Sequence, residues 1–200
     1  MIDALNLAAC TGATAANAAR FAPHLADGMT RFGIASPRAI SVFLGQVGIE
    51  SEGKAGPLAS VEEDLYYTTA DRLRAVYPSL FVKGGYRAEQ YLRNPSALSQ
   101  LRYQGFHGRG LIQLTWRDAY VAAGKALGYD YVERPQLVCE PFHAALTACW
   151  FFAEYKACLP AAEAGDVYTV TGRINGAARL KLAERRMLTD RAYRVLARSL

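Results

Sequence analysis

Residues 40–50 read Ile-Ser-Val-Phe-Leu-Gly-Gln-Val-Gly-Ile-Glu, an apolar run that ends in a carboxylate. As a helix, this run places Phe43, Val47 and Glu50 on one face, at positions i, i+4 and i+7. Burial on an apolar face disfavours the charged form of a carboxyl group, and a general acid must keep its proton near neutral pH. Glu50 is therefore either a candidate general acid or a structural acid at the end of a helix.

Most of the chain has the apolar spacing of amphipathic helices, so the expected fold class is mainly α. The clearest helix start is Ser36-Pro37, where Ser is a cap and Pro takes the first helical position. Other helices are expected over residues 3–20, 27–32, 69–77, 118–127, 141–157, 166–175 and 180–198. Residues 78–110 lack apolar periodicity, which indicates small helices and irregular loops, and residues 111–115 are interpreted as a strand or a buried extended turn.

The length and composition favour one well-buried domain. The chain has 200 residues, 52% of them hydrophobic and 20% charged, which excludes a disordered protein. The composition changes over residues 78–110, where Tyr, Arg, Asn, Gly and Pro become frequent. We therefore expect a larger helical lobe of about residues 1–60 and 110–200, with a smaller lobe of about 61–109 inserted into it.

Positive charge is concentrated at the C-terminal end. The net charge is +5, and residues 173–200 hold eight basic and two acidic side chains, so they carry +6 and residues 1–172 carry −1. Such a segment favours an anionic polymer as partner: nucleic acid, a membrane surface or a bacterial cell wall. The alternative is an ordinary solvated helix face.

Metal and cofactor sites are not expected. The three histidines and four cysteines are scattered, without zinc-type spacing or a CxxC pair, so no metal, no cofactor and no implied disulfide follow. No run of about 20 apolar residues and no signal-like N-terminus is present. We expect synthesis in the cytoplasm without an export signal or transmembrane segment.

Acidic residues gather after the apolar run, at Glu52, Glu62, Glu63 and Asp64. Glycoside hydrolysis needs two carboxyl groups in different environments, one protonated to supply a proton and one ionised to activate water or attack. Glu50 has the apolar setting for the first role, and Glu62 or Glu63 has the polar setting for the second. Paired acids at such spacing are also common on surfaces.

A glycine-rich segment, residues 105–115, reads GFHGRGLIQLT. Its glycines allow positive φ or close backbone approach. If the segment is extended, Gln113 and Thr115 share one side and can hold a sugar and a water, while Ile112 and Leu114 face the core. The phosphate-loop spacing GxxxxGK[ST] is absent. A glycine-rich turn that enters a buried strand is the alternative interpretation.

Four segments resemble glycoside hydrolase family 19, which holds plant-type chitinases and many phage endolysins. They are QVGIESEG (46–53), EDLYYT (63–68), GRGLIQLTWRDAY (108–120) and RING (173–176). The chain is similar to the compact endolysin branch, whose motifs run roughly as HESGG, ENLxYS, GRGPIQLTxRxNY and INGG. The resemblance covers about residues 40–190. It implies a lysozyme-like, two-lobed helical fold, with a substrate cleft between the lobes and no separate cell-wall-binding domain.

The resemblance also implies roles for single residues. Glu50 matches the general acid and Glu63 the general base, with adjacent Glu62 as its competitor. Thr115 matches the residue that helps to hold the attacking water. The expected substrate-binding or cleft-lining positions are Gln113, Asn175, Tyr67, Arg109 and Arg185. The family inverts stereochemistry, which requires carboxyl groups roughly 6.5–9.5 Å apart with water between them.

Three positions depart from the family motifs. Ile49 replaces the His before the general acid, and Ala119 replaces an Asn that contacts the substrate or water. Glu52 replaces the first Gly of a pair and adds a third acid near the site. By like-charge repulsion, Glu52 is expected to raise the pKa of Glu50 further.

The expected activity is that of an endolysin, a monomeric glycosidase that cleaves β-1,4 bonds between the amino sugars of bacterial peptidoglycan. The resemblance implies action on the wall from the host cytoplasm with a holin-type permeabilising partner, and the basic C-terminal helix would contact an anionic wall or outer membrane. A chitinase acting on N-acetylglucosamine polymers is the alternative. A basic helical protein that binds nucleic acid or membranes is a remote one, because it would need neither carboxylate.

Overall fold

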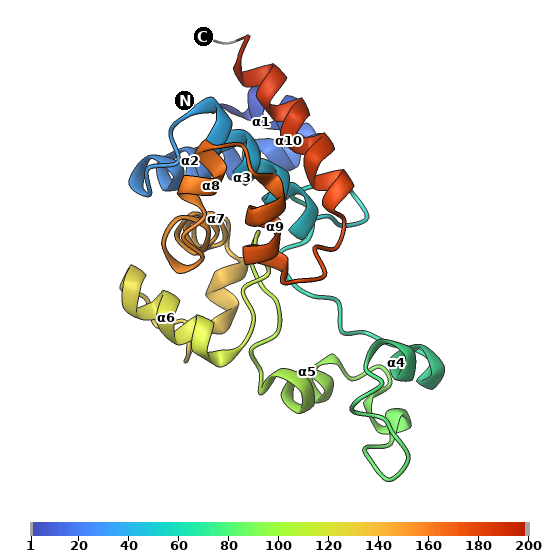
Figure 1. The fold of residues 1–200 in the computed structure, drawn as a ribbon. Helices are drawn as coiled ribbons and strands as arrows, with labels where there is room; N and C mark the ends of the chain where they lie inside the picture. The colour runs from blue at the N-terminus through green and yellow to red at the C-terminus, as the bar shows by residue number, and fades with distance from the viewer. Residues whose placement is uncertain (1, 199–200) are drawn as a thin grey trace.

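The computed structural model describes residues 2–198, and it is mainly helical (Figure 1). Its α-helices are α1 (Ala4–Thr11), α2 (Ala15–Arg31), α3 (Pro37–Glu50), α4 (Ala70–Val76), α5 (Pro95–Tyr103), α6 (Arg117–Leu127), α7 (Pro141–Trp150), α8 (Leu159–Glu163), α9 (Val167–Asn175) and α10 (Leu182–Leu196). Two 3-10 helices, η1 (Ala88–Tyr91) and η2 (Pro135–Cys139), and a π-helical turn, η3 (Phe151–Tyr155), complete this set. The expected fold class is confirmed. Within the described residues, no helix is long and apolar enough to cross a membrane.

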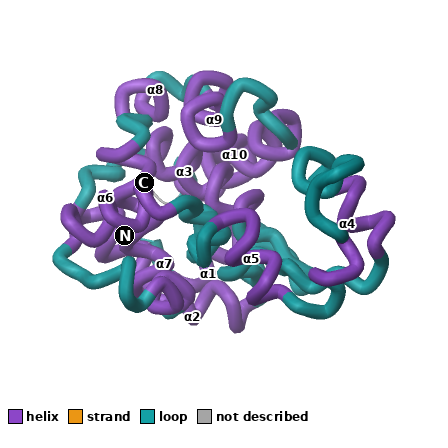
Figure 2. The backbone as a smooth tube through the Cα atoms, turned by 90° about the horizontal axis from the view of Figure 1, so that it is seen from below, coloured by secondary structure: helices purple, strands orange, loops and turns teal. Residues whose placement is uncertain are grey.

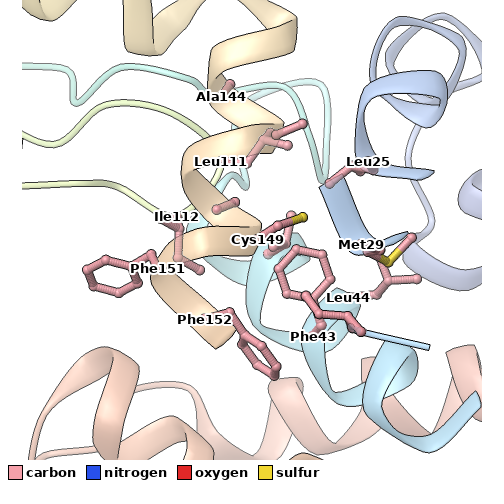
Figure 3. Packing of buried hydrophobic residues seen from close by; sticks show 14 of the residues in the cluster. Leu25, Met29, Phe43, Leu44, Leu111, Ile112, Ala144, Cys149, Phe151 and Phe152 are labelled. Carbon is pink, nitrogen blue, oxygen red and sulfur yellow. The ribbon is translucent and has the colours of Figure 1, made fainter. Parts of the chain in front are cut away.

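Helix α3 runs through the core and places Glu50 at its C-terminal end. It starts as expected, with Pro37 in the first turn and the Ser36 hydroxyl accepting a hydrogen bond from the Ala39 N–H (3.0 Å). Phe43 is fully buried, and its ring meets that of Phe152 at a centroid distance of 5.1 Å. Figure 3 shows side chains from α2, α3 and α7 packed together here. Helices α1 and α10 also pack against α3.

The N-terminal helices differ from the sequence prediction. The expected helix over residues 3–20 is two helices, because Gly12 adopts a left-handed conformation (φ 80°) that ends α1. Thr14 then caps α2 by accepting a hydrogen bond from Asn17 N–H. The expected short helix at 27–32 is the last part of α2, which continues through Pro23.

Two further segments differ from expectation. The helix predicted over residues 141–157 is α-helical only to Trp150 and continues as the π-helical turn η3. Residues 111–115 are not a strand, because Gln113 has φ 53° and a turn brings Leu114 back to pair with Arg109. Helix α8 was not expected, and the basic helix predicted at 180–198 spans Leu182–Leu196.

Buried apolar side chains form two clusters. The large one unites α1, α2, α3, α6, α7, α9 and α10. The small one holds Leu65, Leu73, Tyr77, Phe81, Ala88, Leu98 and Tyr103, contributed by α4, η1, α5 and their loops. Figures 1 and 2 show α4 at one end of the molecule, joined to the helical body by loops. We call residues 65–103 the side lobe.

Candidate active site

Glu50 is held by a buried arginine. Its Oε1 accepts a hydrogen bond from Arg185 Nη2 at 2.7 Å, and the Glu50 and Arg185 side chains are 15% and 2% exposed. Arg185 also donates to Gln46 Oε1 (2.7 Å) and to the Leu180 carbonyl (3.1 Å). The expectation of a lone carboxylate on an apolar face is therefore wrong, because α10 supplies a cation that periodicity in residues 40–50 could not show. Among the described residues, none donates a hydrogen bond to Glu50 Oε2.

A cavity of about 470 Å³ lies beside Glu50, and we call it the Glu50 cavity. Its wall includes three of the predicted site residues, Gln113, Thr115 and Asn175. It also includes residues that the sequence did not single out: Ile112, Trp116, Asp118, Phe151, Tyr155, Lys156 and Ile174. Ala119 lines it too, so the departure from the family's Asn faces the site.

The polar side chains of this wall use some of their hydrogen-bonding groups within the protein. Gln113 Nε2 donates to the Gly110 carbonyl (3.1 Å), and the Thr115 hydroxyl donates to the Gln113 carbonyl (2.7 Å). Asn175 Oδ1 accepts from the Leu180 N–H (2.7 Å), which shapes the loop before α10. The side-chain Oε1 of Gln113, the Thr115 lone pairs and the Asn175 NH₂ group remain for a ligand.

Glu63 is held by groups from three directions. Its Oε1 accepts hydrogen bonds from the Tyr103 hydroxyl (2.8 Å) and the Tyr77 hydroxyl (3.3 Å), and its Oε2 accepts one from the Gly108 N–H (3.2 Å). The tyrosines end α5 and follow α4, so the side lobe positions this carboxylate. Burial raises the pKa of Tyr103 to about 12 and also raises that of Tyr77, with Glu63 contributing to both, so both phenols are donors at neutral pH.

Gly108 connects Glu63 to the Glu50 cavity. Its N–H binds Glu63, while a Cβ added to it would lie 2.7 Å from Gln113 Oε1 and 3.3 Å from Thr115 Oγ1. Glu63 and the polar pair therefore flank the same glycine. Glu63 itself lines a second cavity of about 530 Å³, together with Glu62, Asp64 and His107. The close approach is possible only because residue 108 has no side chain.

Glu62 has different partners from its neighbour. Its Oε1 contacts His107 Nε2 (2.9 Å) and Arg109 Nε (3.1 Å). Burial acts to raise the pKa of Glu62, but the His107 hydrogen bond and the Arg109 charge outweigh it, and the pKa is lowered. His107 Nδ1 faces the Ser99 hydroxyl (2.6 Å) and Arg109 Nη2 (3.2 Å). These donors assign a neutral His107 with its proton on Nε2, and burial lowers the pKa of His107.

Three predicted substrate-binding residues do not line the Glu50 cavity: Arg109, which lines the second cavity, Tyr67, and Arg185, which is buried against Glu50. The Arg109 side chain is 9% exposed, and besides Glu62 and His107 it binds the Gly105 carbonyl and the Tyr120 hydroxyl. The guanidinium of Arg109 is therefore hydrogen-bonded to groups of the protein itself. Tyr67 lines neither cavity, and its ring packs edge-on against Tyr77 at 6.0 Å.

Glu52 has a partner that the sequence did not predict. Its Oε2 accepts a hydrogen bond from Lys181 Nζ at 2.7 Å, and both side chains are about half exposed. The ammonium lies beside the extra negative charge, and the expected effect of Glu52 on Glu50 stays a prediction. No local signal points to this pair, because 129 positions separate its members.

Trp116 forms part of the Glu50 cavity in a rare backbone conformation, φ 74° and ψ 142°. Its ring lies 5.2 Å from that of Tyr103, the Arg102 guanidinium lies 4.7 Å from it, and its side chain remains 44% exposed. Strained backbone at a non-glycine residue is typical of functional sites. Tyr103 therefore contacts both Glu63 and the wall of the Glu50 cavity.

Comparisons with known proteins identify the family of this chain. The family model described as chitinase class I, of glycoside hydrolase family 19, matches residues 11–187. A glycosyl hydrolase family 19 domain-containing protein of Haemophilus influenzae is 30% identical over 172 residues, 75% of this chain and 79% of that protein. Endochitinase EP3 of Arabidopsis thaliana is 38% identical over 66 residues, 32% of this chain and 22% of the endochitinase.

Among solved structures, chitinase C of Streptomyces griseus matches 98% of this chain and 76% of its own, with a TM-score of 0.63 and 20% identity. This likeness shows a helical, lysozyme-like fold. With the family match, it defines the protein as a glycosidase. The chain belongs to glycoside hydrolase family 19.

Proposed function

We propose that this protein hydrolyses the β-1,4 bonds between the amino sugars of bacterial peptidoglycan, as an endolysin, by an inverting acid/base mechanism. The observation that carries the proposal is the arrangement around Gly108. Glu50 lines a cavity with Gln113 and Thr115, and Glu63 binds the same glycine that those two side chains approach. Glu50 and Glu63 have different partners and both lie next to the turn that holds Gly108, Gln113 and Thr115. Inverting hydrolysis uses two carboxyl groups in different environments.

Glu50 is the general acid. Arg185 fixes the carboxyl group through Oε1, which leaves Oε2 to carry the proton toward the cavity. As the bond between C1 and the glycosidic oxygen breaks, Glu50 transfers this proton to the leaving oxygen. Arg185 then stabilises the carboxylate that remains.

Glu63 is the general base. Its Oε1 accepts from two phenols, whereas Oε2 accepts only from the Gly108 N–H and keeps a lone pair, so Oε2 is the oxygen that accepts a proton from water. The Thr115 hydroxyl donates to the Gln113 carbonyl, and therefore offers its lone pairs to that water. The water oxygen bonds to C1 from the face opposite the leaving group, and the configuration inverts.

Substitution of the carboxyl groups tests these roles. Glu50→Gln and Glu63→Gln should each lower kcat at least 100-fold without unfolding the protein. Glu62→Gln is the matched control, because it removes an adjacent carboxylate that binds His107 and Arg109, and it should affect stability more than kcat. Residual activity near wild type in Glu50→Gln would reject the assignment, and a Glu62→Gln loss equal to that of Glu63→Gln would reject Glu63 as the base.

Digestion of purified peptidoglycan tests the substrate. Mass spectrometry of the new reducing ends should show hydrolytic products and identify which of the two alternating bonds is cut. Anhydro products would contradict attack by water. Failure to release any fragment from peptidoglycan, with chitin oligomers cleaved, would replace the proposal with the chitinase alternative.

Chitin is the second candidate substrate, because the plant endochitinases and the bacterial chitinase C that resemble this chain carry that activity in their names. Charge favours peptidoglycan, since chitin is an uncharged polymer. Helix α10 exposes Arg186 and Arg194, Arg198 is exposed just after it, and the net charge is +5. We propose that this face contacts the anionic wall or an outer membrane, and that a holin-type partner gives the monomeric enzyme access to the wall.

A further inference from the structure

Lys156 is a cation in the wall of the Glu50 cavity that the proposed mechanism does not use. It is half-buried, and its ammonium lies 5.2 Å from the ring centre of Phe151 and 5.4 Å from that of Tyr155. Both rings line the same cavity. Cation–π contacts of this kind hold an ammonium group in place without neutralising its charge.

The backbone around Lys156 is specialised. The Lys156 N–H donates to the Phe151 carbonyl (2.8 Å), the i→i−5 bond of the π-helical turn η3. This turn stacks the rings of Phe151 and Tyr155 at 5.3 Å and 27°. Ala157 follows with φ 47°, and the Arg173 guanidinium binds its carbonyl. Single π-helical turns within helices often occur at functional sites.

Lys156 differs from the other cations near the site in its ion pairs. Arg185 pairs with Glu50, Arg109 with Glu62, and Lys181 with Glu52. Within residues 2–198, no carboxylate forms an ion pair with Lys156. A positioned ammonium without an acidic partner in a cavity wall can pair with a negative charge that a ligand brings.

We propose that Lys156 binds a carboxylate on the substituent of an amino sugar, and so makes the site selective for peptidoglycan over uncharged chitin. This inference rests on the proposed function. Every second sugar of peptidoglycan carries a lactyl ether, which ends in a carboxylate when the peptide is absent and in a peptide with its own carboxylates when it is present. Both sources share one chemistry, and chitin has neither.

The test compares substrates that differ in charge. Wild type, Lys156→Met and Lys156→Arg are assayed on chitin oligosaccharides, on peptide-free glycan strands, on the same strands with methylated carboxyl groups, and on intact peptidoglycan. Lys125→Met is the matched control, because Lys125 is exposed on α6 and lines neither cavity. The readout is the ratio of kcat/KM for each glycan substrate to that for chitin oligosaccharides.

We expect Lys156→Met to lower this ratio about tenfold, as loss of one charge-assisted hydrogen bond predicts. Lys156→Arg should restore most of it, and Lys125→Met should match wild type. If Lys156→Met lowers the ratio on peptide-free strands, and methylation of those strands lowers the wild-type ratio equally, Lys156 binds the lactyl carboxylate. If Lys156→Met lowers the ratio only on intact peptidoglycan, Lys156 binds a carboxylate of the peptide. An unchanged ratio in Lys156→Met overturns the role of Lys156 and leaves the proposed function standing. Wild type that cleaves no peptidoglycan-derived strand overturns the proposed function as well.

Discussion

Glu63 shows how much of this site depends on single hydrogen bonds. Its three donors are two phenols and one backbone N–H, and the shorter phenol contact comes from Tyr103. Donors to a carboxylate favour its charged form, which is the form that a general base needs. The same tyrosine packs on Trp116, so its position is set by the cavity wall as well as by the side lobe.

Tyr103→Phe should lower kcat about tenfold with little change in KM, because one hydrogen bond to a charged group is lost. Tyr77→Phe should show the same change more weakly, as its contact is longer (3.3 Å). Steady-state kinetics on both variants measure these effects.

Tyr91→Phe is the control for packing, because Tyr91 contacts the same small cluster and its ring lies 5.8 Å from that of Phe81. A kcat of Tyr103→Phe equal to that of Tyr91→Phe would contradict the role of Tyr103 as a positioning residue for Glu63.

The sequence predicted the members of this site better than their environments. Gln113, Thr115 and Asn175 stood out in the sequence because they belong to short motifs, and all three line the Glu50 cavity. The partners of Glu50 and Glu52 are 135 and 129 positions away, and those of Glu63 include Tyr103, 40 positions away. Periodicity describes a helix face but not what packs against it, so these charges and donors had no local signal.

At the scale of elements, the contact between α3 and α10 decides where Arg185 meets Glu50. The helices approach so closely at Gly45 that an added Cβ would lie 2.3 Å from Thr189 Oγ1 and 2.9 Å from the Arg185 carbonyl. The second contact is with backbone, which cannot move aside without shifting α10. The position of Arg185 therefore depends on a glycine in the apolar run.

Gly45→Ala should destabilise the fold by about 1–3 kcal/mol, the usual cost of overpacking. It should also lower kcat, because a shifted α10 carries Arg185 away from Glu50. Gly48→Ala is the matched control on the same helix, since the one close contact of its Cβ would be the flexible end of Leu188 at 2.9 Å, with Pro57 Cβ at an ordinary 3.9 Å. Urea unfolding and kinetics on both variants measure the difference. Equal effects of the two substitutions would contradict this account.

The helices themselves were largely predictable, and their interruptions were not. The pair Ser36-Pro37 identified the start of α3, because a cap acts within one turn. The break at Gly12 is a single residue of low helix propensity between Ala-rich stretches that favour one continuous helix. The π-helical turn η3 has the same apolar composition as α7, so periodicity could not separate them.

At the scale of the whole molecule, a buried polar network joins the side lobe to the helical body. His107 contacts Ser99 of α5 on one side and Glu62 on the other, and Arg109 extends the network to Tyr120 of α6. The network contains a neutral histidine and a charged carboxylate whose pKa values are both lowered in the fold. Folding stability is therefore linked to pH through the junction of the two parts.

The sign of this linkage follows from proton uptake. An unfolded histidine titrates near 6.5, whereas burial keeps folded His107 neutral to lower pH. As pH falls below about 6.5, the unfolded chain binds a proton that the folded chain does not, and the free energy of unfolding decreases. Glu62 adds a second decrease from about pH 4.5 downward, where the unfolded carboxyl group takes up a proton before the folded one does.

We expect urea unfolding to show constant stability between pH 7 and 8 and a steady loss between pH 6.5 and 5. His107→Gln should flatten that loss, because glutamine does not titrate, whatever its effect on stability at pH 7.5. Burial also lowers the pKa of His143, so His143→Gln should remove a separate part of the slope and the double variant most of it. A His107→Gln slope equal to wild type over this range would show that the junction network does not control acid stability.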